Sequence, residues 1–253
     1  MKGVTRAGWI RLLVVALLLL ALEGACRAGW IDPVAVIAPS AMAAGAWHLL
    51  ASGQYTSHIL LTLTNVAMAC GLAVAAGFVL GWVLYKLPRL RRAADPLLAS
   101  YYAVPTFIFY PLFIVLFGLN RWPLVAIGFI FAIVAMALST LQGFERVPVA
   151  LRRTARAMRL STAQEMIHVV LPSCVPYLFT GIRLAIVYSL IGVIAGEFVL
   201  SGAGFGFDIA FAYNSFDNAT MYGLMLLLLS FVIVLNLLLH TWEQRLYLRR
   251  GGR

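Results

Sequence analysis

Two ionisable residues, Arg183 and Glu197, lie inside one long apolar stretch, residues 173–200. A charge at membrane depth is energetically costly, so such residues are usually paired or functional. Arg183 follows Ser173 by ten residues, which places it about 15 Å along a helix. It can reach back to the membrane surface, pair with an acid or attract an anionic solute. Glu197 can contact a solute or an outer gate, or it can bond to a neighbouring helix or to interfacial water. Both are therefore candidates for a solute path.

A second group of polar side chains lies in the segment YYAVPTFIFYP, residues 101–111. Pro105 and Pro111 each remove a backbone donor and kink or break a helix. Such breaks are tolerated at membrane depth where the freed carbonyls are covered by protein or line a watery path. Tyr102, Thr106 and Tyr110 supply hydroxyl groups beside the prolines. The segment predicts either part of a translocation path or a kinked packing helix with tyrosines at the membrane interface.

The remaining reactive residues do not form a catalytic, metal or nucleotide site. His48 and His58 lack a third metal ligand, and the three cysteines are too widely spaced for a metal site. The chain has no GxSxG nucleophile motif and no GxxxxGK[ST] phosphate loop. The glycine-rich stretch SGAGFG, residues 201–206, lacks the lysine of such a loop. We therefore expect no catalytic residue, no metal and no cofactor in this chain, and an intramembrane enzyme is disfavoured.

The composition places these residues in a membrane protein. Of the 253 residues, 63% are hydrophobic and 11% are charged, whereas soluble domains have about 45–50% apolar and about 25% charged residues. A helix needs roughly 20 apolar residues to cross a bilayer. Six segments approach or exceed that length: about 10–28, 57–85, 97–118, 122–142, 173–200 and 219–242. The sequence predicts an all-α polytopic membrane protein with six transmembrane helices in a single domain, residues 1–253.

The positive charges predict its orientation. The net charge is +10, and all but three of the 19 Lys and Arg residues lie on one side of the six predicted spans. The exceptions are Arg27, Arg121 and Arg183. Positively charged loops stay in the cytoplasm, so both termini are predicted to be cytoplasmic. This distribution explains the charge without a nucleic-acid partner. The first segment also resembles a signal peptide, but its cleavage site is weak and we expect a retained helix.

Two glycine patterns predict close helix packing. The second segment contains GFVLG, residues 77–81, and the fifth contains GVIAG, residues 192–196. GxxxG patterns let helix backbones approach each other closely in lipid.

An inner loop at about residues 144–172 interrupts the apolar pattern with two short predicted helices. Pro148 suits the first turn of a helix whose arginines surround one apolar stripe. Ser161 and Gln164 fit the S-x-x-Q capping box of a second helix. Because an apolar stripe on an inner helix needs a cover, we expect the loop to dock on a cytoplasmic partner. The expected docking residues are Arg153, Thr154, Ala155, Met158, Arg159, Leu160, Ser161, Gln164, Leu171 and Pro172.

The same loop resembles the EAA loop of ABC-importer permeases, which has the pattern E-A-A-x3-G-x9-I-x-L-P. The stretches DPLLASYYAVPTFIFYPLFIVLFGLN and GIRLAIVYSLIGVIAGEFVLSGAGFGFDIAFA resemble the third and fifth spans of the nitrate/sulfonate/taurine-type permeases. The resemblance covers about residues 40–245, and the loop, its flanking spans and the orientation agree with one another. The pattern falls on Arg153, Thr154 and Ala155, then Arg159 for its glycine, Val169 for its isoleucine, and Leu171-Pro172.

The resemblance implies an ABC type I importer-like fold and a multi-pass permease of the bacterial inner membrane. Its docking loop is expected to bind cytoplasmic ATPase subunits, which bind ATP and Mg²⁺ and drive alternating access. The permease is expected to act as a homodimer or with a similar permease, together with an extracytoplasmic solute-binding protein. The implied solute is small, such as a sulfonate or other organic anion, nitrate, or an aromatic heterocycle. The alternative is a channel or secondary transporter independent of an ATPase, which leaves the docking loop unexplained.

Two positions depart from the family pattern. Arg153 stands where the family has glutamate, and Arg159 stands where it has glycine. A helix end at the glycine position favours a residue that tolerates positive φ, and an arginine there costs about 1 kcal/mol or more. We therefore expect either a break built differently, through the Ser161 cap, or a partner whose groove has changed and carries an acidic residue facing Arg153.

Overall fold

The computed structural model of the chain describes residues 6–32 and 34–249, and all regular structure within those residues is helical. The α-helices in chain order are α1 (Arg6–Arg27), α2 (Pro39–Ser52), α3 (Thr56–Lys86), α4 (Pro88–Ser100), α5 (Tyr110–Phe117), α6 (Trp122–Glu145), α7 (Val149–Ala157), α8 (Thr162–Glu165), α9 (Leu171–Leu200), α10 (Phe205–Asn214) and α11 (Asn218–Arg249). Two 3-10 turns, Tyr101–Ala103 and Thr106–Phe109, lie between α4 and α5, and a π turn, Met166–Val170, joins α8 to α9.

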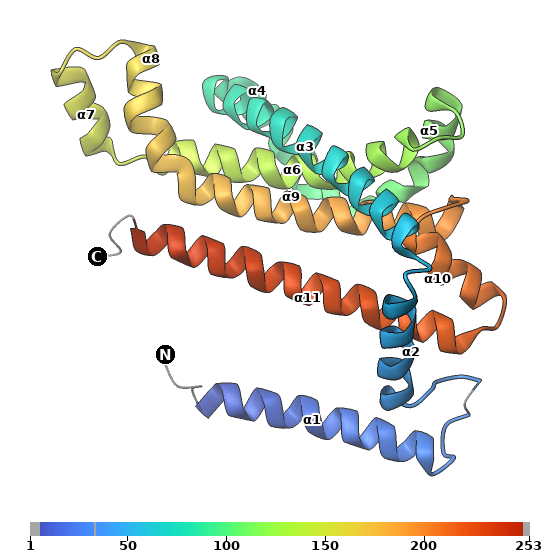
Figure 1. The fold of residues 1–253 in the computed structure, drawn as a ribbon. Helices are drawn as coiled ribbons and strands as arrows, with labels where there is room; N and C mark the ends of the chain where they lie inside the picture. The colour runs from blue at the N-terminus through green and yellow to red at the C-terminus, as the bar shows by residue number, and fades with distance from the viewer. Residues whose placement is uncertain (1–5, 33, 250–253) are drawn as a thin grey trace.

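Helices α3, α6 and α9 form the core of the bundle. Figure 1 shows α6 and α9 side by side, with α3 crossing them. The glycine patterns permit this approach, as predicted. A Cβ atom at Gly81 would lie only 2.5 Å from the Ala137 carbonyl oxygen on α6. A Cβ atom at Gly192 of α9 would lie 2.9 Å from the Cα atom of Gly128, also on α6.

The peripheral helices distinguish two ends of the molecule. The first residues of α1, the last residues of α11 and the turn between α7 and α8 lie at one end, whereas α2, α5 and α10 lie at the other (Figure 1). We call these the inner and outer ends, following the predicted orientation. Helix α11 packs against α2 and α10 at the outer end, and α1 contacts α2. The chain ends themselves, residues 1–5 and 250–253, lie outside the described residues.

Among the described residues, five helical segments are long and apolar enough to span a bilayer. They are Gly8–Arg27, Thr56–Lys86, Trp122–Glu145, Thr162–Val199 and Asn218–Gln244. The count of six spans and the cytoplasmic location of both termini stay predictions.

The other expected span, residues 97–118, is not a continuous helix. It comprises the end of α4, the two 3-10 turns and α5. The predicted break is confirmed, because Pro105 separates the two 3-10 turns and Pro111 lies in the first turn of α5. Helix α4 begins at the inner end and α5 lies at the outer end (Figure 1). The chain therefore passes between the two ends in short pieces.

Candidate functional site

The inner loop contains two helices separated by a left-handed turn. Helix α7 ends at Ala157, and Arg159 has a φ of 54°. The N–H of Leu160 donates to the Ala155 carbonyl at 3.1 Å, and the N–H of Arg159 donates to the Arg156 carbonyl at 3.0 Å. These two hydrogen bonds define a Schellman motif. The glycine position of the EAA pattern thus keeps a glycine-type conformation with an arginine in it, at a cost of about 1 kcal/mol.

The second helix of the loop begins at the predicted capping box. Ser161 Oγ accepts a hydrogen bond from the N–H of Gln164 at 3.3 Å, and Gln164 Oε1 accepts one from the N–H of Ser161 at 2.9 Å. Helix α8 then continues through the π turn into α9. Pro172, in the first turn of α9, accounts for the wider turn, since a proline ring clashes with the carbonyl four residues before it. The second half of the loop is therefore a helical extension of α9.

The outward surface of the loop combines arginines with apolar side chains. Arg153, Arg156 and Arg159 are exposed, and they make no ion pair with the other side chains that the structure describes. Met158 is 68% exposed. The other exposed large apolar side chains of the loop are Val149, Leu151 and Ile167. An apolar surface with a basic rim is suited to a partner with an apolar groove and acidic edges.

Other predicted docking residues support this surface from within or lie at its edges. Ala155 is 2% exposed, and Leu160 is half-buried. Leu171 packs against the buried cluster that includes Phe144. Thr154 and Pro172 are exposed, and Thr154 Oγ1 donates to the Ala150 carbonyl at 3.1 Å. Ala155 and Leu171 therefore hold the loop in place and contribute little to its surface.

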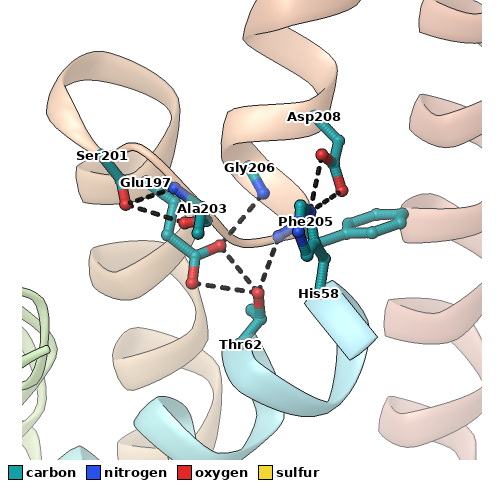
Figure 2. Close-up of polar contacts among 8 residues, drawn as sticks. All are labelled: His58, Thr62, Glu197, Ser201, Ala203, Phe205, Gly206 and Asp208. Carbon is teal, nitrogen blue, oxygen red and sulfur yellow. Dashed lines mark hydrogen bonds and ion pairs between the residues drawn. The ribbon is translucent and has the colours of Figure 1, made fainter. Parts of the chain in front are cut away.

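At the outer end, the carboxyl group of Glu197 is fully buried and held by hydrogen bonds. Thr62 Oγ1, from α3, lies 2.9 and 2.8 Å from the two carboxyl oxygens, and the N–H of Gly206 donates to one of them at 3.0 Å. Thr62 Oγ1 also accepts from the N–H of Phe205 at 2.8 Å. Figure 2 shows these contacts converging from three segments of the chain. Of the roles considered for Glu197, the structure supports bonding to a neighbouring helix.

The glycine-rich stretch 201–206 wraps around this carboxyl group. Gly204 has a φ of +115°, and a Cβ atom there would lie 2.4 Å from the carboxyl carbon of Glu197. A Cβ atom at Gly206 would lie 2.5 Å from the Ile194 carbonyl oxygen. Ser201 Oγ closes the turn through the carbonyl and N–H of Ala203. Glycines are required here because the backbone approaches a buried side chain of the same molecule.

His58 and Asp208 form a second polar contact close to the hydrogen bonds of Glu197 (Figure 2). His58 Nδ1 lies 2.7 and 2.8 Å from the two carboxyl oxygens of Asp208. Burial raises the pKa of Asp208, and the hydrogen bond and charge of His58 act in the opposite direction. His48 is exposed. Within the described residues no group of three or more His, Cys, Asp or Glu side chains could hold a metal ion.

The predicted path residues of the broken segment have different environments. The side chain of Tyr102 lies outside the described residues. Pro105 is exposed, Thr106 is buried, and Tyr110 is buried in a cluster with Leu124. A cavity of about 340 Å³ lies between α3, α9 and α11, and none of the predicted path residues lines it. The assignment of these residues to a translocation path stays a prediction.

Arg183 pairs with an acid, which is one of the three roles considered for it. Its Nη1 donates to a carboxyl oxygen of Glu243, on α11, at 3.0 Å. Thr180 Oγ1 donates to the other oxygen at 3.2 Å. The Arg183 charge is therefore balanced within the chain.

Sequence reasoning missed the partners Thr62 and Glu243. A polar pair, Thr62 and Asn65, falls three residues apart on one face of an apolar helix, and this signal could have indicated a buried polar contact. Glu243 is an acid close to the end of the last span. Nothing local in the sequence indicates which residue either of them meets.

Comparisons with known proteins place this geometry in a family. The family described as binding-protein-dependent transport system inner membrane component matches residues 73–250. The nitrate import permease protein NrtB of Leptolyngbya laminosa is 31% identical over 183 residues, which cover 72% of this chain and 64% of that protein. The taurine transport system permease protein TauC of Escherichia coli K12 is 27% identical over 152 residues, covering 60% and 55%. The chain therefore matches less than two thirds of the length of these relatives.

A solved structure shows the same fold. An inward-facing conformation of the MetNI methionine ABC transporter superposes with a TM-score of 0.66 at 17% identity, covering 77% of this chain and 97% of that chain. The family match extends over more than half of the chain and includes the inner loop, α9 and the outer turn around Glu197. The chain is thus a multi-pass membrane protein that belongs to the family of binding-protein-dependent transport system inner membrane components.

Proposed function

We propose that the chain is the permease subunit of an ATP-driven importer that carries a small solute across the bacterial inner membrane. ATP and Mg²⁺ would be bound and used by a separate cytoplasmic subunit, since the chain has no phosphate-binding loop of its own. The observation that carries the proposal is the exposed apolar and basic surface of α7 together with its turn, Val149–Arg159. A cytoplasmic helix with this surface needs a partner that covers Met158 and its neighbours.

The geometry of the loop suits the transmission of movement. The ATPase would hold α7 in a groove, and closure of two ATPase subunits would displace the loop. Because α8 continues through the π turn into α9, a displacement of the loop turns α9 with it. The core helices would then alternate between inward and outward access.

We propose that the solute path lies between two permeases, either two copies of this chain or this chain and a similar one. None of the predicted path residues lines the described cavity between α3, α9 and α11, which favours a path outside the packed interior of one chain. An extracytoplasmic binding protein would deliver the solute at the outer end, near α2, α5 and α10. Cross-linking of single cysteines at equivalent positions in two copies would test the homodimer.

For the solute we propose a small anion, with an aromatic heterocycle as the second class to test. The relatives named above are called nitrate and taurine permeases, and these solutes carry an anionic group. The charge of Arg183 is already balanced by Glu243, so selectivity would rest on the binding protein. Uptake of labelled nitrate, taurine and a pyrimidine in cells with and without the chain distinguishes the two classes.

The docking function is tested by Met158→Asp. A carboxylate at a 68% exposed position leaves the fold intact but places a charge in the proposed apolar contact. We expect recovery of the ATPase subunit with the purified chain to fall about tenfold or more, with loss of uptake. The control is Leu119→Asp, which introduces the same carboxylate in place of an exposed apolar side chain outside the loop and should leave ATPase recovery unchanged.

Two results would contradict the proposal. Unchanged ATPase recovery and uptake for Met158→Asp would remove the docking role of the loop. Failure to recover any ATPase subunit with the wild-type chain from native membranes would instead favour the channel or secondary transporter.

A further inference from the structure

Arg152 differs from the other arginines of α7 in the direction of its side chain. Arg153 and Arg156 are exposed, whereas Arg152 is half-buried. Its Nη2 donates to the Phe144 carbonyl oxygen at 2.8 Å, and its Nη1 donates to the Tyr85 hydroxyl oxygen. The guanidinium carbon also lies 5.5 Å from the centroid of the Tyr85 ring. One side chain of α7 therefore contacts the inner ends of both α3 and α6.

Both contacts of Arg152 are made at the last turn of a core helix. Phe144 is in the last turn of α6, where carbonyl groups lack intrahelical donors and the helix dipole is negative. Tyr85 is in the last turn of α3, and its ring centroid lies 5.2 Å from that of Phe144, which is fully buried. A guanidinium group can donate two hydrogen bonds and stack on a ring at the same time, which an ammonium group cannot do.

The rest of the chain connects α7 to these helices less directly. Only the short segment 146–148 joins α6 to α7, and α3 is separated from α7 in sequence by α4, α5 and α6. The second half of the loop has a continuous helical connection, but that connection leads to α9. Among the described side chains, the polar contact between α7 and α3 is that of Arg152 with Tyr85.

We propose that Arg152 is a positioning residue that transmits movement of the docked α7 to the inner ends of α3 and α6. This inference rests on the proposed docking function. When a partner displaces α7, the guanidinium group would carry Tyr85 and the last turn of α6 with it, while the continuous helix carries α9. All three core helices then respond to a single docking event.

The experiment uses the complex of the chain with its ATPase in membranes, and a cysteine in place of Lys86. Lys86 is the exposed last residue of α3, next to Tyr85. The rate of reaction of this cysteine with a membrane-impermeant maleimide is measured without nucleotide and with ATP plus vanadate. The chain without the Lys86→Cys change gives the background from the native cysteines. We expect nucleotide to change the labelling rate in the otherwise wild-type chain, because the end of α3 moves.

Arg152→Gln should reduce this nucleotide-dependent change by about tenfold, the scale of one lost charge-assisted hydrogen bond, while the ATPase stays bound. Tyr85→Phe keeps the ring and removes the hydroxyl, so it should give a smaller reduction. Arg152→Lys keeps the charge and loses the fork, so it should restore the response only in part. Arg89→Gln, which removes an exposed arginine of α4, is the matched control and should leave the response unchanged.

The outcomes separate this inference from the docking function. An equal response in Arg152→Gln, Tyr85→Phe and the wild type overturns the inference, as does a wild-type α3 that fails to respond with the ATPase bound. If Arg152→Gln does not fold, the labelling response of Tyr85→Phe is compared with that of the wild type, and an equal response overturns the inference. A wild-type chain that binds no ATPase overturns the docking function instead.

Discussion

The turn after α7 and the turn after α10 share an unusual backbone feature. Arg159 has a φ of 54° in the first turn, and Phe216 has a φ of 57° in the second. In the turn after α10, the N–H of Asp217 donates to the Ala212 carbonyl at 2.9 Å, and the N–H of Phe216 donates to the Tyr213 carbonyl at 3.1 Å. This is the Schellman pattern of Arg159 repeated at the opposite end of the molecule. Each turn places a non-glycine residue in a conformation that favours glycine.

The two regions differ in where their side chains find partners. At the outer end, the carboxyl groups of Glu197 and Asp208 are bonded to groups of the same chain, and we call these two residues with Thr62 and His58 the outer cluster. In the inner loop, the arginines at 153, 156 and 159 face outward without an ion pair among the described side chains. The outer cluster is therefore complete as part of the fold, whereas the inner surface is suited to a second molecule. Substitutions in the outer cluster should lower the stability of the chain, whereas substitutions on the inner surface should weaken binding of the ATPase.

The largest effect is expected for Glu197→Ala. The change leaves the N–H of Gly206 and the hydroxyl of Thr62 without their acceptor and opens a space under the turn. We expect a loss of about 3 kcal/mol or more in the free energy of unfolding, measured as a lower thermal midpoint in detergent. Asp95→Asn, at an exposed carboxyl group of α4, is the control and should change stability by less than about 0.5 kcal/mol.

Glu197→Gln distinguishes the structural role from a role in transport. The amide keeps an oxygen that can accept from Gly206, and it keeps the volume of the side chain. If the carboxyl group serves the fold, the variant retains most of its stability and its uptake. A folded Glu197→Gln variant without uptake would show that the charge serves the solute or the gate. The outer carboxyl group would then not be a purely structural element.

The next effect comes from a matched pair, Arg159→Gly and Phe216→Gly. Each removes a side chain from a left-handed position, so each should raise stability by about 1 kcal/mol. The two variants should differ in ATPase binding, since only Arg159 lies on the proposed docking surface. We expect Arg159→Gly to weaken ATPase recovery at low salt and Phe216→Gly to leave it unchanged. Equal ATPase binding by the two variants would exclude Arg159 from the docking contact.

Local signals in the sequence were the most informative. The Ser161–Gln164 capping box was predicted because its two hydrogen bonds join residues three apart. The conflict at Arg159 was also visible in advance, since a helix-ending pattern placed an arginine at a glycine position. The break at Pro105 follows from one residue type. Its boundaries depend on packing against α6 and α9, and they could not be predicted.

Contacts between distant segments could not be predicted from the same patterns. Thr62 and Glu197 are separated by 135 positions, and Arg152 and Tyr85 by 67. The sequence marked Glu197 as costly in a membrane, but many arrangements could offset that cost. Only the folded chain shows that Gly204 and Gly206 pack against the side chain of Glu197.

The smallest effect concerns Asp208 and its pH dependence. Burial raises the pKa of Asp208 above its ordinary value of 3.8, with His58 opposing the shift. The native chain then binds this proton more readily than the unfolded chain. The stabilising contribution of Asp208 is therefore complete below its unfolded pKa and decreases as pH rises through its folded pKa. Asp208→Asn removes this titration, so the wild type should lose stability relative to the variant as pH rises from about 4. Thermal midpoints of both chains across this range measure the difference. A wild type that instead gains stability relative to Asp208→Asn would mean that the charged pair with His58 outweighs burial, and the outer cluster would then depend on an ion pair.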